Sequence, residues 1–320
     1  MTAIATPNAP TRTPHAGNRA PMLDGLRGWA VLGVMLHHYW PAATFRQSVA
    51  GISMQAFFVM SGFLITGQLL RNRIGIERGT DRPWTVVGQF FWRRFLRLTP
   101  VFYAVLLVMW LIGVEEVRYS FWWHVLYASN VYVVQIQDWP LWVSHFWSLA
   151  VEQQFYLVWP LLILFVPRVA LLPTLLLAFA AGPLYRYIGA ANDVTWLTIY
   201  VMPFGYLDSL AIGGLLAFFG QNAPGHERAQ TRLVTMCGWL GGLGVTTSIV
   251  QTLFAYPMPY LAIWNVVEQM LWALWMAWLV DRGWRNRGGV VMRTLIGLEV
   301  EIEHDERPRL APILAQRAFH

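Results

Sequence analysis

Apolar runs of membrane-spanning length recur along most of the chain, separated by short polar segments. A bilayer core of about 30 Å requires about 20 apolar residues in a helix. The runs predict spans near residues 26–44, 51–70, 98–114, 145–166, 169–188, 204–220, 233–253 and 260–281, and a ninth that begins near 290. Residues 121–135 are short and aromatic, which favours a re-entrant or interfacial piece. The runs are continuous and do not alternate, so an all-α polytopic transmembrane bundle is expected and a β-barrel is not.

Composition supports this class of protein and excludes others. The chain is 56% hydrophobic and only 12% charged, whereas soluble domains carry roughly 25% charged residues. The 23 basic residues are all Arg and gather at the ends of the apolar runs, which indicates membrane topology and no nucleic-acid partner. The one cysteine, Cys237, lies in an apolar run, so neither an intrachain disulfide nor a cysteine metal cluster is expected.

Arginine placement predicts the orientation. With the N-terminus in the cytoplasm, 17 arginines fall in inner segments, among them Arg93, Arg94 and Arg97, and 3 fall in outer segments (Arg46, Arg118 and Arg186). Because cytoplasmic loops are enriched in basic residues, we expect an integral protein of a bacterial inner (plasma) membrane with a cytoplasmic N-terminus.

Three regions are expected along the chain. Residues 1–21, rich in Pro, Thr, Ala and Asn, predict a disordered cytoplasmic N-terminus, and no apolar core precedes an early cleavage site. Residues 22–298 form the membrane domain. Residues 299–320 are a charged tail that cannot span a membrane.

Ionisable residues inside the first predicted span need a partner or a function. At about 100° per residue, Asp24, Arg27 and His38 share one helical stripe, while His37 points about 100° away from His38. His37 is therefore favoured as a packing residue or as a neighbour of the site. His38 alone would be open to a purely structural role as a hydrogen-bonding residue.

A second set of polar residues lies in the predicted fourth span. His145, Ser148 and Glu152 are spaced by three and four residues and share a helical face. Helix rise places Glu152 roughly 10 Å, and His38 and Glu268 roughly 12 Å, from the outer surface. Similar depths on three spans predict a shared intramembrane site. The alternative for Glu152 is a buried carboxyl that holds helices together.

Other polar residues are open to plainer explanations. Asp208 and Glu268 are favoured as structural residues. His124 and His145 fall at the outer interface, where polar groups cost little. The run from Arg93 to Arg97 is either a topogenic stop signal or an anion site, because Arg94 and Arg97 lie one turn apart and suit phosphate groups.

Four ordered motifs resemble the acyltransferase-3 family of integral membrane O-acyltransferases. The opening MLDGLRGWAVLGVMLHH has the family's Leu-Asp-Gly-Leu-Arg and a His fourteen residues after Asp24, which is His38. The other three motifs are QAFFVMSGFLIT (55–66), RRFLRLTPVFY (93–103) and HFWSLAVEQQFYLVWP (145–160). A weaker match is GYLDSLAIGGLLA (205–217), and the resemblance runs from about residue 22 to 298.

The chain also departs from the family pattern of about nine or ten helices. Gln153 replaces the second Glu of the family's VEEQ motif, while Glu152 keeps the first. After residues 295–297 the family continues into a final aromatic helix, whereas this chain turns to LEVEIEHDERPRLAPILAQRAFH. The last helix is therefore expected to be truncated or altered.

The resemblance implies transfer of an acyl group, often acetyl, from cytoplasmic acyl-CoA to a hydroxyl of a carbohydrate or similar acceptor. We hypothesise that His38 is the general base and that Glu152 orients or charge-pairs its imidazole. Arg94 and Arg97 would hold CoA phosphates, with Asp24 and Arg27 at the inner mouth of the donor route. Ser61, Ser148 and His37 would line the substrate channel, although for Ser61 a packing role is favoured. No metal is implied.

Two alternatives remain open. A proton-coupled membrane transporter would also place His and Glu inside the bilayer, although such carriers more often show internal repeats, and none is evident. The other is a catalytically inactive relative, which the altered C-terminus makes credible.

Overall fold

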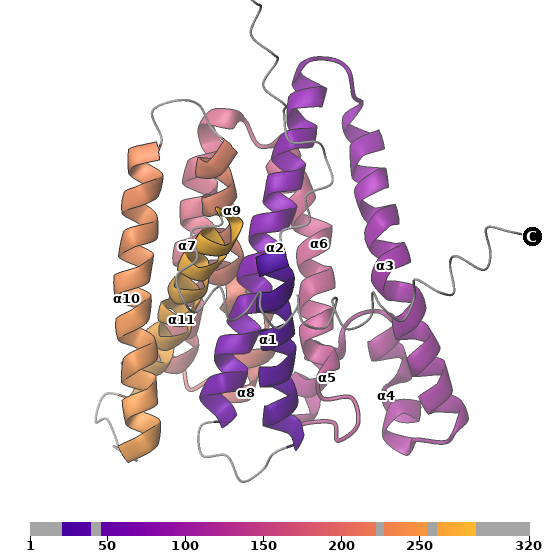
Figure 1. Cartoon of the computed structure of the whole chain (residues 1–320). Coiled ribbons are helices and arrows are strands. Elements are labelled where there is room, and N and C mark those ends of the chain that lie inside the picture. Colours follow the sequence, from indigo (N-terminus) through magenta and orange to yellow (C-terminus); the bar gives the residue numbers. More distant parts are fainter. Residues whose placement is uncertain (1–20, 40–45, 222–226, 255–260, 286–320) are drawn as a thin grey trace, which may run out of the picture. The chain divides into compact units, whose positions relative to one another are not determined.

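The computed structural model of this chain describes residues 21–39, 46–221, 227–254 and 261–285 (Figure 1). The chain divides into two compact units. One comprises residues 1–26 and 282–320, in which the described residues are the first turns of α1, with Leu23 and Leu26 buried, and the end of α11. The other, Arg27–Asp281, holds the helical bundle described below. The predicted ninth span and the charged tail lie outside the described residues.

Every described element is helical. In chain order they are α1 (Pro21–Tyr39), α2 (Arg46–Glu77), α3 (Pro83–Leu111), α4 (Glu115–Val125), α5 (Ser129–Ile136), α6 (Phe146–Phe165), α7 (Arg168–Ala191), α8 (Trp196–Val201), the 3₁₀ turn η1 (Pro203–Tyr206), α9 (Leu207–Gln221), α10 (Glu227–Phe254) and α11 (Leu261–Trp284). The predicted all-α polytopic class is confirmed. Among the described residues, six segments are long and apolar enough to span a membrane: α2, α3, α6, α7, η1 with α9, and α10.

Each of the eight complete predicted spans corresponds to one helix, with α1 and α11 occupying the first and the eighth. The aromatic stretch 121–135 forms no span. It is divided between α4 and α5, which are 11 and 8 residues long. A chain of that length cannot cross a bilayer core as a helix.

The predicted start of the third span, residue 98, is wrong. α3 begins at Pro83, which occupies the first turn after an extended Arg82. Proline is well suited to that position because its missing N–H has no helical partner there. The arginines that suggested a polar inner segment favour helix, so Arg93, Arg94 and Arg97 lie within α3.

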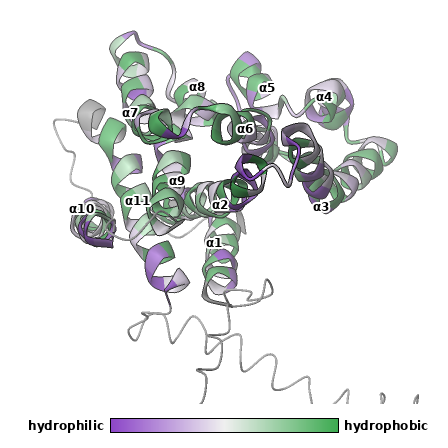
Figure 2. Ribbon diagram, turned by 90° about the horizontal axis from the view of Figure 1, so that it is seen from above, coloured by the Kyte–Doolittle hydropathy of each residue, from purple (hydrophilic) through white to green (hydrophobic). Residues whose placement is uncertain are grey.

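The packing of α2 against α9 forms the centre of the bundle, with α6 and α7 beside it (Figure 2). Gly62 and Gly213 allow the close approach. A Cβ atom on Gly62 would overlap the carbonyl oxygen of Leu210, and one on Gly213 would overlap that of Val59. Small residues at helix crossings are typical of membrane proteins, because dispersion contacts between close backbones replace the hydrophobic effect there.

A buried ion pair joins α7 to α9. Arg186, which is 2% exposed, donates from Nη2 to Asp208 Oδ2 at 2.6 Å, and Asp208 is fully buried. The same guanidinium also donates to the carbonyl oxygens of Gly205 and Val266. Arg186 was counted among the outer arginines, and the structure adds that its charge is neutralised by Asp208 inside the bundle. Asp208 has the structural role expected of it.

Seven described arginines lie at the end of the bundle where α2 leads to α3, α6 to α7, and α9 towards α10. We call this the arginine-rich end; it lies at the top of Figure 1 and comprises Arg71, Arg73, Arg78, Arg82, Arg168, Arg228 and Arg232.

Loss of one partner of the buried pair should destabilise the fold. We expect Asp208→Asn to lower stability by about 3–5 kcal/mol, because Arg186 would keep a buried charge without a counter-ion. Thermal unfolding in detergent, followed by size-exclusion chromatography, measures the change. Asp193→Asn, at an exposed turn with φ of 55°, is the matched control and should shift stability by about 0.5 kcal/mol or less. Equal midpoints for the two variants would contradict a stabilising role for the pair.

Candidate active site

A carboxylate in the fourth predicted span is held by hydroxyl groups from two helices. Glu152 Oε1, on α6, accepts a hydrogen bond of 2.8 Å from Ser61 Oγ of α2. It also accepts a short hydrogen bond from the phenol of Tyr156, one turn further along α6. Two donors on one oxygen fix the position of the carboxylate.

The local sequence explains how α6 presents this group. Glu152 and Tyr156 are separated by four residues and therefore share a helical face. Two residues after Glu152, Gln154 exchanges hydrogen bonds with Asn130 of α5, at 2.9 and 3.3 Å, and donates to the carbonyl oxygen of Tyr127. These amide contacts fix the rotation of α6 near its first turns.

An arginine from a third helix completes what we call the Glu152 cluster (Ser61, Arg94, Glu152 and Tyr156). The guanidinium of Arg94 lies over the ring of Tyr156, 5.0 Å from its centroid, and 5.7 Å from that of Phe90. The Tyr156 ring is 2% exposed and meets Phe90 edge-on. Cation–π contacts of this kind hold a positive charge near the tyrosine and leave the N–H donors of arginine available.

The other predicted site residues lie on α1, on α3 and at the start of α6. Arg97 is exposed on α3, whereas Arg94 is half-buried. Asp24, Arg27 and His37 are half-buried on α1. Ser148 donates to the backbone carbonyl of His145, at 3.0 Å, at the start of α6. The backbone of His38 continues α1, but its side chain lies outside the described residues.

Glu268, the third residue of similar predicted depth, has its own partners. It accepts a hydrogen bond of 2.6 Å from Ser248 of α10. Ser248 in turn accepts from the indole of Trp272. These contacts join α10 to α11 and agree with the structural role favoured for Glu268.

A model of the family described as "Acyltransferase domain", the acyltransferase-3 family, matches residues 21–295. The chain belongs to the acyltransferase-3 family. The assignment made from the four motifs is confirmed, and the Glu152 cluster draws its members from three of them.

Curated relatives of this acyltransferase-3 protein are O-acetyltransferases by name. It is 31% identical over 210 residues to the peptidoglycan O-acetyltransferase OatA of Listeria monocytogenes, covering 60% of this chain and 30% of that protein. It is 33% identical over 166 residues to the O-acetyltransferase OatA of Staphylococcus aureus, covering 46% and 25%. A putative O-acetyltransferase of S. aureus is 29% identical over 231 residues, covering 62% and 34%. The matched segments thus span about a third or less of these relatives, and no solved structure matches.

Tyr156 is the member of the Glu152 cluster that was not predicted from the sequence. Its position four residues after Glu152 was a usable signal, because i and i+4 side chains meet on a helix. The aromatic character of the whole motif concealed it, since one tyrosine among several rings predicts packing. For Ser61, packing was favoured over a channel role, and the structure adds a direct hydrogen bond to Glu152.

His124 was expected at the outer interface with a structural role, and the structure shows how the protein encloses it. The imidazole, on the short helix α4, is fully buried, with hydrogen bonds of 2.8 Å to both Ser120 and Ser129. Removal from water lowers the pKa of His124 from 6.5 to about 4. The neutral imidazole therefore joins α4 to the start of α5.

This pKa predicts a pH-dependent stability. Between pH 6.5 and 4 the unfolded chain binds a proton at His124 that the folded chain does not. The contribution is complete above pH 6.5 and is lost as the pH falls, by at most about 1.4 kcal/mol per pH unit. We expect His124→Gln to flatten the fall of the thermal midpoint in detergent between pH 7.5 and 4.5. His145→Gln, at an exposed histidine, should leave the slope unchanged, and an unchanged slope in both variants would contradict the prediction.

Proposed function

We propose that this chain is a membrane-bound O-acyltransferase that moves an acyl group, acetyl in the first instance, from cytoplasmic acyl-CoA to a hydroxyl of a carbohydrate or similar acceptor. The observation that carries the proposal is the Glu152 cluster: a carboxylate fixed by two hydroxyl groups, with an arginine over one of the donor rings, in a chain of the acyltransferase-3 family.

In this proposal His38 is the general base. An imidazole has the pKa range to take the proton of a hydroxyl and pass it on near neutral pH. The acceptor oxygen attacks the thioester carbonyl carbon, a C–O bond forms, and the C–S bond breaks. The proton held by His38 then passes to the CoA thiolate, so that the base is regenerated.

Glu152 acts through His38 as a positioning and charge-pairing residue. A carboxylate beside an imidazole fixes its orientation and stabilises the imidazolium that forms. Ser61 and Tyr156 support this role because they restrict the rotamer of Glu152. Ser148 and His37 line the acceptor channel.

The donor is proposed to approach from the same side of the membrane as the arginine-rich end. CoA is polyanionic, and bidentate guanidinium groups suit its phosphates. Arg94 and Arg97 would hold these phosphates, with Asp24 and Arg27 along the donor route. A Listeria relative is named for peptidoglycan, which supports a carbohydrate as the acceptor.

CoA release tests the activity. Membranes that contain the wild-type chain, acetyl-CoA and a cell-envelope acceptor fraction should release free thiol. His38→Ala should lower the rate at least about 100-fold, the usual size of a general-base contribution. Tyr156→Phe removes a hydrogen bond to a charged group, worth about 1.5–3 kcal/mol. We therefore expect a loss of about tenfold or more in kcat, with little change in KM for acetyl-CoA.

Tyr187→Phe is the matched control, because Tyr187 is an exposed tyrosine of α7, and it should keep the wild-type rate. Release that is equal in wild-type and His38→Ala membranes would reject His38 as the base. Absence of release from a well-folded wild-type chain, with proton-coupled flux of a solute, would favour the transporter. Absence of both would favour the inactive relative.

Orientation can be tested with single cysteines, since Cys237, the one cysteine, is buried. With the N-terminus in the cytoplasm, Arg78→Cys lies on the inner side and Asn192→Cys on the outer side. A membrane-impermeant maleimide added to intact cells should label Asn192→Cys only, and both variants after lysis. Labelling of Arg78→Cys alone in intact cells would reverse the proposed topology.

A further inference from the structure

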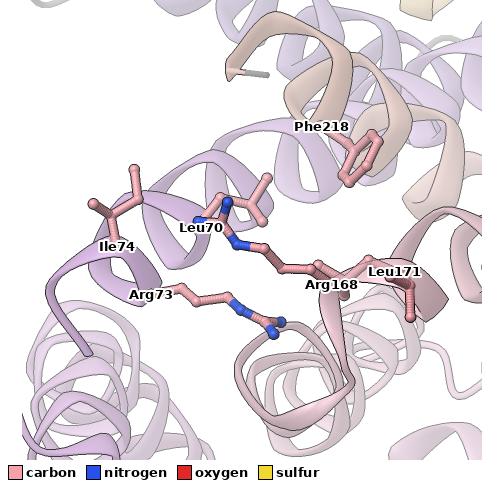
Figure 3. A pocket seen from close by; sticks show the side chains of 7 residues that line it. Leu70, Arg73, Ile74, Arg168, Leu171 and Phe218 are labelled. Atoms are coloured by element: carbon pink, nitrogen blue, oxygen red, sulfur yellow. The ribbon is translucent and has the colours of Figure 1, made fainter. Parts of the chain in front are cut away.

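A second polar site lies at the arginine-rich end, apart from the Glu152 cluster. Arg73 of α2, Arg168 of α7 and Phe218 of α9 line a pocket of about 250 Å³ together with Leu70 and Leu171 (Figure 3). Arg73 follows Ser61 by twelve residues along α2, which corresponds to about 18 Å in a helix. None of these residues belongs to the proposed acyl-transfer machinery.

The two guanidinium groups share one carboxylate. Glu77 Oε1 accepts from Arg73 Nε at 2.9 Å and from Arg168 Nε at 2.8 Å, while its Oε2 pairs with Arg168 Nη2 at 2.5 Å. Arg73 Nη1 donates to the carbonyl oxygens of Ile163 and Val166 at the end of α6, both at 2.7 Å. These bonds hold two cations side by side across the pocket (Figure 3).

Donor capacity remains after these bonds are made. A guanidinium has five N–H donors. Within the described part of the chain, Arg73 Nη2 and Arg168 Nη1 donate to no protein acceptor, although the Arg73 side chain is only 9% exposed. The Arg168 side chain is 58% exposed, and unused guanidinium donors at a pocket suit an anionic ligand.

The charge of the site specifies the kind of anion. Two arginines and one glutamate leave a single positive charge, which balances the single negative charge of one phosphodiester. Acyl-CoA carries several phosphate charges, and drug-sized ligands occupy roughly 300–1,000 Å³. A pocket of about 250 Å³ therefore suits a small monoanionic headgroup better than a whole nucleotide cofactor.

The apolar part of the pocket specifies what the anion is attached to. Leu70, Ile74 and Leu171 line the pocket beside the guanidinium groups, and Val169 is 88% exposed. Three membrane-spanning segments, α2, α7 and α9, begin or end here, so the pocket lies where headgroups meet acyl chains. Basic pockets between transmembrane helices at such depths bind anionic lipid headgroups.

We propose that this pocket binds the phosphodiester of an anionic phospholipid. Arg73 and Arg168 donate to the phosphate oxygens, and the acyl chains extend over Val169 and Ile74. The lipid joins the ends of α2 and α7 and stabilises the bundle. This site goes beyond the proposed function and does not depend on it.

Lipid binding to the purified full-length chain tests the proposal. Native mass spectrometry after titration should show tighter binding of dioleoylphosphatidylglycerol than of dioleoylphosphatidylcholine. Arg168→Gln should weaken phosphatidylglycerol binding about fivefold, the effect of about one basic residue at a membrane surface. Arg168→Lys should keep most of the affinity. The matched control is Arg78→Gln, which removes the same charge from an exposed residue that does not line the pocket.

A second variant guards against a folding defect. Val169→Trp fills the pocket from an exposed position without a change of charge, and it should also weaken phosphatidylglycerol binding. Equal binding of the two lipids by the wild-type chain, or wild-type affinity in both Arg168→Gln and Val169→Trp, would overturn the proposal. Displacement of the lipid by millimolar sn-glycerol 3-phosphate or inorganic phosphate would overturn it in favour of a soluble phosphate ligand.

Discussion

The close contact between α2 and α9 is the constraint on which the rest of the bundle depends. Gly62 and Gly213 bring the two backbones together where any side chain would overlap a carbonyl oxygen. Gly62 is the neighbour of Ser61, so the same contact fixes the hydroxyl that holds Glu152. On the other side of α9, Asp208 binds Arg186 of α7. The register of α2 against α9 thus sets the positions of both Ser61 and Asp208.

Polar groups in this bundle are satisfied by short-range partners on neighbouring helices. Thr66 of α2 accepts from the Trp159 indole of α6 at 2.7 Å, and Ser248 links Glu268 to Trp272. In hydrocarbon an unpaired polar group costs several kcal/mol, so each such bond also specifies which helices are neighbours. The arginines have two kinds of position. Arg73 and Arg186 hold helices together, whereas Arg94 lies in the Glu152 cluster.

The sequence predicted the helices well because membrane helices are determined by local composition. Each of the eight complete apolar runs corresponds to a helix in the described part of the chain, and the aromatic stretch 121–135 forms no span. Boundaries were less predictable where arginine, a good helix former, followed a helix start: α3 begins at Pro83 and not at residue 98. The partners of individual charges were not predictable at all. Whether Arg186 faces water or Asp208 depends on how α7 packs against α9, which no local pattern encodes.

The candidate site was predicted in part for the same reason. Helical spacing and depth selected Glu152, and motif resemblance selected Arg94 and Ser61, but their mutual contacts depend on how α2, α3 and α6 pack. The contact of Tyr156 with Arg94 became evident only from the packing of these helices. The burial of His124 could not be predicted from hydropathy, because it depends on how α4 and α5 pack against α6.

The way Arg94 is held has a consequence for ligand exchange. Its guanidinium lies over the rings of Tyr156 and Phe90, and no carboxylate in the described part of the chain pairs with it. The anion proposed to bind at Arg94 would therefore not have to displace a carboxylate of the described residues. A ring-face contact is worth only about 0.5–2 kcal/mol, so the Arg94 guanidinium can turn towards a bound anion at little cost. As it turns, the positive field over the Tyr156 ring weakens, and the phenol becomes a poorer hydrogen-bond donor to Glu152. Binding of an anion at Arg94 would thus weaken the hydrogen bond from Tyr156 to Glu152.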